Sequence, residues 1–174
     1  QELAREEAEE AARQFLKPAE IRLNAGVMCT LGPKPLLGFL DRFRLEHPNI
    51  ELHLRDVTAA NAVEKLTGGE VDCAVLACPA GKLPTPLKGK RLYRERMMIA
   101  FSRDHRFNTQ KQVRFEELDG ERYIDRLHCE FRSAFLDEVG GHNMELSFPY
   151  ASEREDWIQA MIASGMGIGL LFYG

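Results

Sequence analysis

The order of hydrophobic repeats in the first half of the chain, after a short N-terminal segment, restricts the fold more than any other feature. Residues 21–25 and 50–54 alternate between apolar and polar side chains, which predicts strands, and residues 71–76 form a short apolar run typical of a buried strand. Between them, residues 36–43 and 59–66 carry apolar side chains at helical spacing. This order predicts a β-α-β-α-β unit with parallel strands and crossover helices.

A second α/β unit is predicted beyond a linker. Residues 79–89 contain three prolines and two glycines, which is typical of a hinge. After it, residues 91–101 have the pattern of a long strand, residues 131–139 that of a helix and residues 167–171 that of a closing strand. The segment Ser152-Glu153-Arg154-Glu155 has the pattern of a capping box and predicts the start of another helix.

These patterns divide the chain into three parts. Residues 1–17 predict a helix with a narrow seam of small side chains, and glutamates cover its other faces. Such a helix either pairs with another subunit or lies on its own domain. Residues 20–84 are predicted to form one Rossmann-like α/β lobe and residues 85–171 a second. Lobes of this kind bind ligands between them, where strand ends and helix N-termini converge.

Composition limits the classes of function. The formal net charge is −4, with basic side chains spread among acidic ones, so we do not expect this chain to bind nucleic acid by itself. No apolar run approaches the roughly 20 residues of a membrane span. The acidic N-terminus does not resemble a secretory signal, which favours the cytoplasm. The spacing of the four cysteines fits neither a zinc site nor a disulfide framework, and we expect no metal and no cofactor.

Enzymatic motifs are not found in the sequence. The glycines at 165, 167 and 169 close a predicted helix and open a strand, whereas a dinucleotide-binding loop follows a strand and precedes a helix. Neither a P-loop nor a G-x-S-x-G motif occurs. We therefore expect a protein that is not an enzyme. Two alternatives share the architecture: an enzyme with a split active site, and a free-standing solute-binding protein.

Taken in order, the motifs resemble the effector-binding domain of the LysR-type transcription regulators. The resemblance extends from the first helix to residue 171. It implies a fold like that of the type II periplasmic binding proteins, with a dimerising linker helix and a first lobe that is incomplete at its C-terminal end. The segments that carry it are residues 21–26 (IRLNAG), 33–43, 47–52 (HPNIEL), 66–75 (LTGGEVDCAV), 92–105 and 165–171 (GMGIGLL).

The resemblance also implies partners and a mechanism. A small metabolite, often an anion, binds between the lobes of these proteins and changes how subunits are arranged in a dimer or tetramer. DNA is bound only through an N-terminal domain that this chain does not contain.

Four polar residues are candidates for contact with such an effector. Thr30 lies in the turn before the first helix, where free backbone N–H groups favour an anion; alternatively, it is only an N-cap. Arg126 precedes the helix over residues 131–139 and either pairs with a carboxylate or is a solvated surface charge. Ser102 follows the first strand of the second lobe, and Ser152 is predicted mainly to cap a helix.

His128 and Cys129 form the sharpest local feature. A predicted helix start and the neighbouring Arg126 and Arg132 are expected to lower the pKa of the thiol, which makes Cys129 a candidate for redox sensing. The peroxide-sensing branch of the family resembles this segment, but its second cysteine has no counterpart in residues 130–139. The alternative is that His128 and Cys129 line the effector pocket, or that Cys129 simply packs.

The other three cysteines have no expected redox role. Cys73 is interpreted as structural because it lies in an apolar strand. Cys29 lies near the predicted cleft and Cys78 at the hinge.

Overall fold

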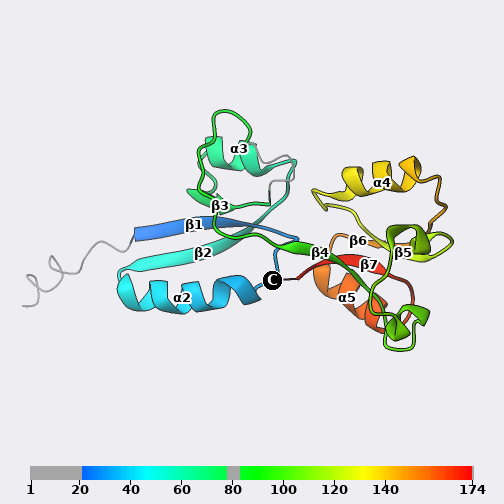
Figure 1. Cartoon of the computed structure of the whole chain (residues 1–174). Helices are drawn as coiled ribbons and strands as arrows, with labels where there is room; N and C mark the ends of the chain where they lie inside the picture. Colours follow the sequence, from blue (N-terminus) through cyan, green and yellow to red (C-terminus); the bar gives the residue numbers. More distant parts are fainter. Residues whose placement is uncertain (1–20, 78–82, 174) are drawn as a thin grey trace, which may run out of the picture.

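The computed structural model describes residues 21–77 and 83–173. The predicted linker helix over residues 1–17 and Cys78 lie outside these ranges. The described elements form two α/β groups that lie side by side (Figure 1). We call the group from β1 to β3 lobe I and the group from β4 to β7 lobe II.

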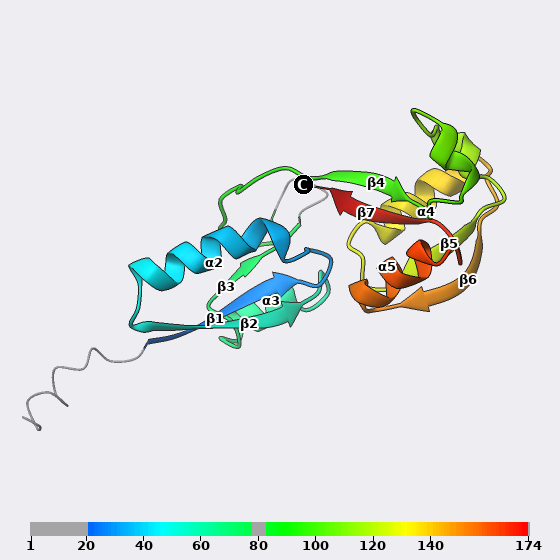
Figure 2. The same ribbon diagram turned by 90° about the horizontal axis from the view of Figure 1, so that it is seen from below.

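Lobe I is the predicted β-α-β-α-β unit. Its strands pair in parallel in the order β2-β1-β3, with Ile21 opposite Ile50 and Ala25 opposite Cys73. The two helices lie on opposite faces of this sheet (Figures 1 and 2). The elements are β1 (Ile21–Met28), α2 (Lys34–Glu46), β2 (Ile50–Val57), α3 (Ala62–Thr67) and β3 (Cys73–Val75).

Lobe II has two strand pairs and two longer helices. β4 (Arg96–Ala100) is antiparallel to β7 (Gly169–Tyr173), and β5 (Arg122–Arg126) is parallel to β6 (Ser147–Ser152). A parallel bridge between Tyr123 and Ile168 links the two pairs. The other elements are the 3-10 helices η1 (Arg106–Thr109) and η2 (Phe115–Leu118), α4 (Arg132–Gly141) and α5 (Glu155–Ala163).

Separate apolar clusters hold the two helices of lobe II to its strands. Phe135 and Val139 of α4 pack with Phe107, Leu118, Tyr123 and Ile168, all of them buried. Ile158 and Ile162 of α5 pack with Ile124. Because Tyr123 and Ile124 are neighbours in β5 and point to opposite faces, the two helices cover opposite faces of this strand.

Close packing accounts for two glycines of the 165–171 motif. A Cβ on Gly167 would lie 2.5 Å from the carbonyl oxygen of Arg122, and one on Gly169 would lie 2.6 Å from Cδ1 of Ile162. These glycines let the backbone before and in β7 approach β5 and α5. Their role is packing, in agreement with the sequence argument against a nucleotide-binding loop.

Two expectations about elements are wrong. The strand expected over residues 91–101 is limited to β4, because the register with β7 begins at Arg96. The capping box at Ser152 is not formed: Ser152 still belongs to β6, and its Oγ accepts a hydrogen bond from the N–H of Arg154, the N-cap of α5, at 3.0 Å. Glu155 and Asp156 place negative charge in the first turn of α5 instead.

No described helix is both long and apolar enough to cross a membrane.

Candidate functional site

Thr30 and Glu130 make a direct contact between the lobes. The hydroxyl of Thr30 donates to the Glu130 carboxylate, with both carboxylate oxygens 2.9 Å from Oγ1. Thr30 is 3% exposed and follows β1, whereas Glu130 lies in the loop between β5 and α4. A side chain of lobe I is therefore bonded to a side chain 100 residues away in lobe II.

Backbone hydrogen bonds fix the position of Thr30. The N–H of Cys29 donates to the carbonyl of Val57 at 3.1 Å, and the N–H of Leu31 donates to the carbonyl of Met28 at 2.9 Å. Met28, Val57 and Ala62 form a buried apolar cluster of lobe I next to this turn. The N-cap of α2 is Pro33, so the interpretation of Thr30 as an N-cap is wrong.

The carboxyl group of Glu130 has a perturbed environment. Burial raises its pKa above the ordinary value, and the hydrogen bond from Thr30 and the positive charge of Arg126 offset part of this effect. Glu95 adds a smaller repulsive contribution that raises the pKa further. The lobes therefore meet at a carboxylate that is costly to bury, is hydrogen-bonded by Thr30 and is favoured by the charge of Arg126.

Arg126 is the buried cation of this region. It ends β5, is 6% exposed, and its Nη2 lies 2.9 Å and 2.7 Å from the two carboxylate oxygens of Glu155, the first residue of α5. The alternative of a solvated surface charge is therefore wrong. Among residues 21–77 and 83–173, the buried Nε of Arg126 has no hydrogen-bond partner. The guanidinium thus retains an unused donor, which is uncommon for a buried group.

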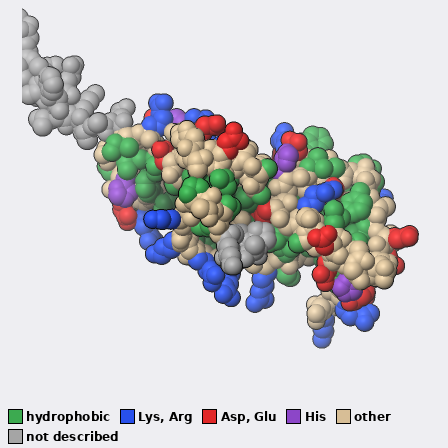
Figure 3. Space-filling view, turned by 90° about the horizontal axis from the view of Figure 1, so that it is seen from above, with side chains coloured by type: hydrophobic (Ala, Val, Ile, Leu, Met, Phe, Trp, Pro, Cys, Tyr) green, Lys and Arg blue, Asp and Glu red, His purple; other side chains and the backbone are tan. Residues whose placement is uncertain are grey.

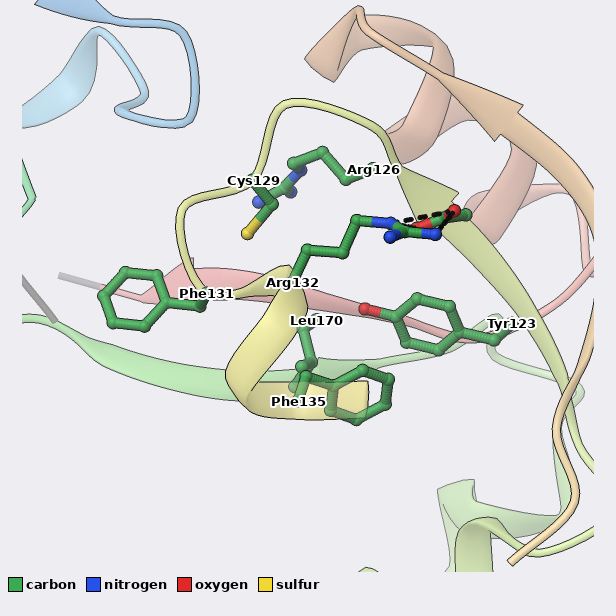
Figure 4. Close-up of a pocket in the computed structure, with 8 residues that line it drawn as sticks. Tyr123, Arg126, Cys129, Phe131, Arg132, Phe135 and Leu170 are labelled. Carbon is green, nitrogen blue, oxygen red and sulfur yellow. Dashed lines mark hydrogen bonds and ion pairs between the residues drawn. The ribbon is translucent and has the colours of Figure 1, made fainter. Parts of the chain in front are cut away.

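A small cavity adjoins Arg126 (Figure 4). Its volume is about 10 Å³, enough for a single water molecule. Arg126 and Cys129 lie together at one end, and Arg132 points away from them toward Asp125, which it pairs with at 2.8 Å. The lining residues are Tyr123, Asp125, Arg126, Cys129, Phe131, Arg132, Phe135 and Leu170.

The thiol of Cys129 differs from the sequence-based expectation. Burial raises its pKa and Glu130 raises it further, whereas the N–H of Phe131 and the charge and side-chain hydrogen bond of Arg126 only partly compensate. The expected lowering of the pKa is therefore wrong, because burial dominates and Arg132 is paired with Asp125. A raised pKa reduces the thiolate fraction at neutral pH.

The two α/β lobes agree with what comparison with known proteins finds. A family model described as the LysR substrate binding domain matches residues 18–172. This chain belongs to the LysR substrate-binding domain family. The resemblance to LysR-type effector domains and the two-lobed α/β fold are thereby confirmed. The match favours a LysR domain over the free-standing solute-binding protein.

Relatives with regulator names agree with the LysR assignment. The uncharacterised HTH-type transcriptional regulator YybE of Bacillus subtilis strain 168 is 25% identical over 166 residues, which cover 95% of this chain and 56% of that protein. OxyR of Escherichia coli K12, a DNA-binding transcriptional dual regulator, is 25% identical over 153 residues, which cover 86% and 48%. The chain thus spans about half the length of the curated relatives that it matches.

Solved LysR structures show the same fold. HinK, a LysR family transcriptional regulator from Pseudomonas aeruginosa, superposes with a TM-score of 0.76 at 25% identity, over 99% of this chain and 59% of that chain. The regulatory domain of CcmR from Synechocystis PCC6803, in complex with 2-PG, superposes with a TM-score of 0.74 at 21% identity, over 87% and 72%.

In this LysR domain, most of the predicted site residues lie at one end of lobe II. Ser152 is paired in register with Arg126, and its carbonyl accepts a hydrogen bond from the N–H of Leu127 at 3.2 Å. His128, in the same loop as Cys129, is half-exposed and lies 3.1 Å from Oε1 of Glu153. Arg126, His128, Cys129 and Ser152 are therefore neighbours, and Glu130 connects them to Thr30.

Ser102 does not join this group. β4 begins on the side of lobe II that faces lobe I and points away from it, and Ser102 follows the end of this strand (Figure 2). There Ser102 lies beside Gly165, beyond the C-terminal end of α5. Glu155, the partner of Arg126, lies at the opposite, N-terminal end of α5. Ser102 was a candidate because it follows the first strand of the second lobe, but β4 is antiparallel to β7, and Ser102 lies at the other end of lobe II from Arg126.

Two residues of the candidate site, Glu130 and Glu155, were not identified from the sequence. An acidic side chain next to an arginine-rich loop was a weak signal for Glu130, but its partner is 100 residues away. Cys73 lies in a strand as expected, but its side chain is exposed, so the interpretation of Cys73 as a buried structural residue is wrong.

Proposed function

We propose that this chain is the effector-sensing part of a LysR-type transcription regulator and that a small metabolite binds between its lobes. The observation that carries this proposal is the polar contact of Thr30 with Glu130 beside the buried Arg126, since a ligand placed there touches both lobes. The proposed contact residues are Thr30, Arg126, His128, Cys129 and Ser152.

Arg126 and Thr30 favour an anionic group on the effector. Arginine binds carboxylates and phosphates through several donors in one plane, and the free Nε of Arg126 gives it capacity beyond Glu155. Among proteins of this fold, the CcmR regulatory domain was solved with 2-PG and the QuiR effector-binding domain with shikimate. These ligands support a small-molecule effector here.

We propose that the effector acts by shifting the arrangement of the lobes and of the subunits. A ligand that binds one arrangement better than another shifts their populations, and one that binds both equally shifts nothing. Self-association is supported by α2, which has no buried residue among the described ones and exposes Leu37, Phe39 and Leu45. Large apolar side chains left exposed on one helix are compatible with a protein interface.

DNA binding is proposed for the whole regulator, through an N-terminal domain, and not for this chain. Its net charge is −4, and on the face shown in Figure 3 acidic and basic side chains occur over both lobes. A DNA-binding surface is normally a continuous basic patch. We also propose that the regulator acts in the cytoplasm and catalyses no reaction.

A second candidate function is redox sensing at Cys129. The similarity to OxyR and the position of Cys129 next to Arg126 favour it, and the raised pKa of the thiol disfavours it. Effector binding therefore accounts better for the site.

A screen of the full-length protein tests the proposal. Thermal unfolding is followed with a panel of small carboxylates and phosphates, and subunit assembly is measured by analytical ultracentrifugation with each compound that raises the Tm. We expect at least one compound to raise the Tm and to change the assembly or the binding of target DNA. A panel in which compounds bind without changing assembly or DNA binding would contradict the proposed sensing role.

A further inference from the structure

We propose that the Glu130 carboxylate is an internal ligand of the anion site between the lobes, and that an anionic effector must displace it. This inference rests on the proposed function, which it deepens by naming the group that competes with the effector. Glu130 would then set the threshold for binding and hold the lobes together while no effector is bound.

The hydroxyl of Thr30 supplies the hydrogen-bond donor for this anion site. A hydroxyl group has one hydrogen to donate, and here both oxygens of one carboxylate lie at 2.9 Å from it. Because Thr30 is almost fully buried, its hydroxyl needs a partner within the protein or on a ligand. The position opposite Thr30 is therefore shaped for a carboxylate, and Glu130 fills it.

Arg126 supplies the positive charge for this anion site. Its positive charge acts on Glu130 across the same region, and it acts on the thiols of Cys29 in lobe I and Cys129 in lobe II as well. Its Nε is buried and makes no hydrogen bond within the described parts of the chain. Thr30 and Arg126 thus supply a donor and a cation for one anion, and Arg126 has a donor left for an anion larger than a side-chain carboxylate.

Glu130 is held weakly enough for an anion to replace it. It lies in the loop of residues 127–131, so it can turn away without a change in β5 or α4. Burial disfavours its charged form, which offsets part of what Thr30 and Arg126 contribute. A free anion that also contacts Arg126 Nε has more hydrogen bonds to gain at this position than Glu130 does.

Chemical rescue tests the inference without knowledge of the natural effector. Glu130→Ala in the full-length protein removes the internal carboxylate, and acetate, the smallest carboxylate that resembles the lost group, is titrated by isothermal calorimetry and by NMR. Glu130→Ser removes the same group with a polar replacement and serves if the alanine variant does not fold. We expect saturable acetate binding that is tighter than in the wild type by about tenfold or more, because a tethered carboxylate competes at high effective concentration.

Three controls make the result specific. Acetamide has the shape of acetate without the charge and is expected not to bind. Glu138→Ala removes an exposed carboxylate from α4 and is expected to behave as the wild type. The double variant Thr30→Val, Glu130→Ala lacks the donor and is expected to lose the rescue.

The outcomes separate this inference from the proposed function. Absence of acetate binding in both folded Glu130 variants, or binding that persists without the Thr30 hydroxyl, would overturn the internal-ligand role. If a metabolite still binds the wild type through Thr30 in that case, the proposed function stands alone. If rescue succeeds but the metabolite panel changes neither assembly nor DNA binding, the internal ligand is supported and the proposed sensing role fails.

Discussion

At the scale of single residues, the site depends on a few buried polar groups whose partners are far away in the sequence. Arg126 and Thr30 were expected to meet a ligand, and each already has an internal carboxylate, Glu155 and Glu130 respectively. The identities of such partners cannot be predicted from one sequence, because no local spacing relates residue 30 to residue 130. Substitutions of single residues therefore test how much each buried polar group contributes to stability.

Thr30→Val is expected to lower the free energy of unfolding by about 1 kcal/mol, because the Glu130 carboxylate loses a hydrogen-bond donor and is only partly buried. Urea denaturation measures this change. Thr109→Val, which alters a hydroxyl bonded to the carbonyl of Arg106 on the surface of η1, is the control and is expected to change stability by less than about 0.5 kcal/mol. Equal effects for the two variants would show that the contact between the lobes is not stabilising.

The free energy of unfolding is expected to depend on pH through Glu130. Burial raises the pKa of Glu130 in the folded protein, so the folded state binds its proton more tightly than the unfolded state does. This proton stabilises the folded state fully below the unfolded pKa, and the stabilisation is lost as pH rises through the folded pKa. Glu130→Gln removes this loss. The wild type is therefore expected to become less stable relative to Glu130→Gln as pH rises from about 4 to 7. Denaturation at several pH values measures the difference, and a constant or opposite trend would refute a raised pKa.

Cys129 is expected to react slowly with thiol reagents. Burial raises the pKa of both thiols, so access decides the order: Cys129 is half-buried, whereas the side chain of Cys73 is exposed. Mass spectrometry after a short treatment with iodoacetamide or hydrogen peroxide is expected to find Cys73 modified before Cys129. In urea, which unfolds the protein, the two thiols are expected to be modified to the same extent. Modification of Cys129 first, with a change in promoter binding, would support the redox alternative instead.

At the scale of helices and strands, elements were predicted correctly where their own sequence carries the hydrophobic repeat. Prediction failed where the bounds of an element depend on pairing with another strand. The β-α-β-α-β order of lobe I is confirmed, since each element carries its own repeat. The length of β4 and the end of β6 at Ser152 depend on partner strands, and both expectations were wrong. The glycines near β7 were seen in the sequence, but their reason, close approach to β5 and α5, required the structure.

Gly167→Ala tests this packing. The added Cβ would lie 2.5 Å from the backbone carbonyl of Arg122, so β7 must shift, and we expect a loss of about 1–3 kcal/mol in the free energy of unfolding. Gly140→Ala is the matched change: no described atom other than those of its own helix backbone and neighbours lies within 4 Å of the new Cβ. In α4 it is expected to stabilise by up to about 1 kcal/mol. A neutral Gly167→Ala variant would mean that the two strands tolerate a wider separation.

At the scale of the whole molecule, the family and the two-lobed plan were predictable, because six short motifs in order carry more information than any single residue. The set of residues at the candidate site was only partly predictable. Arg126, His128, Cys129 and Ser152 lie together as the loop positions suggested, whereas Ser102 is carried away by the antiparallel direction of β4. The identity of the effector does not follow from the sequence or from the fold, since the same fold accommodates different ligands.

The most direct test of the central claim is calorimetric titration of the full-length protein with the tightest compound from the metabolite screen, repeated with Thr30→Val and with the Thr109→Val control. A ligand held between the lobes by Thr30 is expected to lose about fivefold or more in affinity in Thr30→Val, equivalent to about 1 kcal/mol for one hydrogen bond, and nothing in the control. Equal affinities for the wild type and Thr30→Val would place the ligand outside the contact between the lobes and contradict the account.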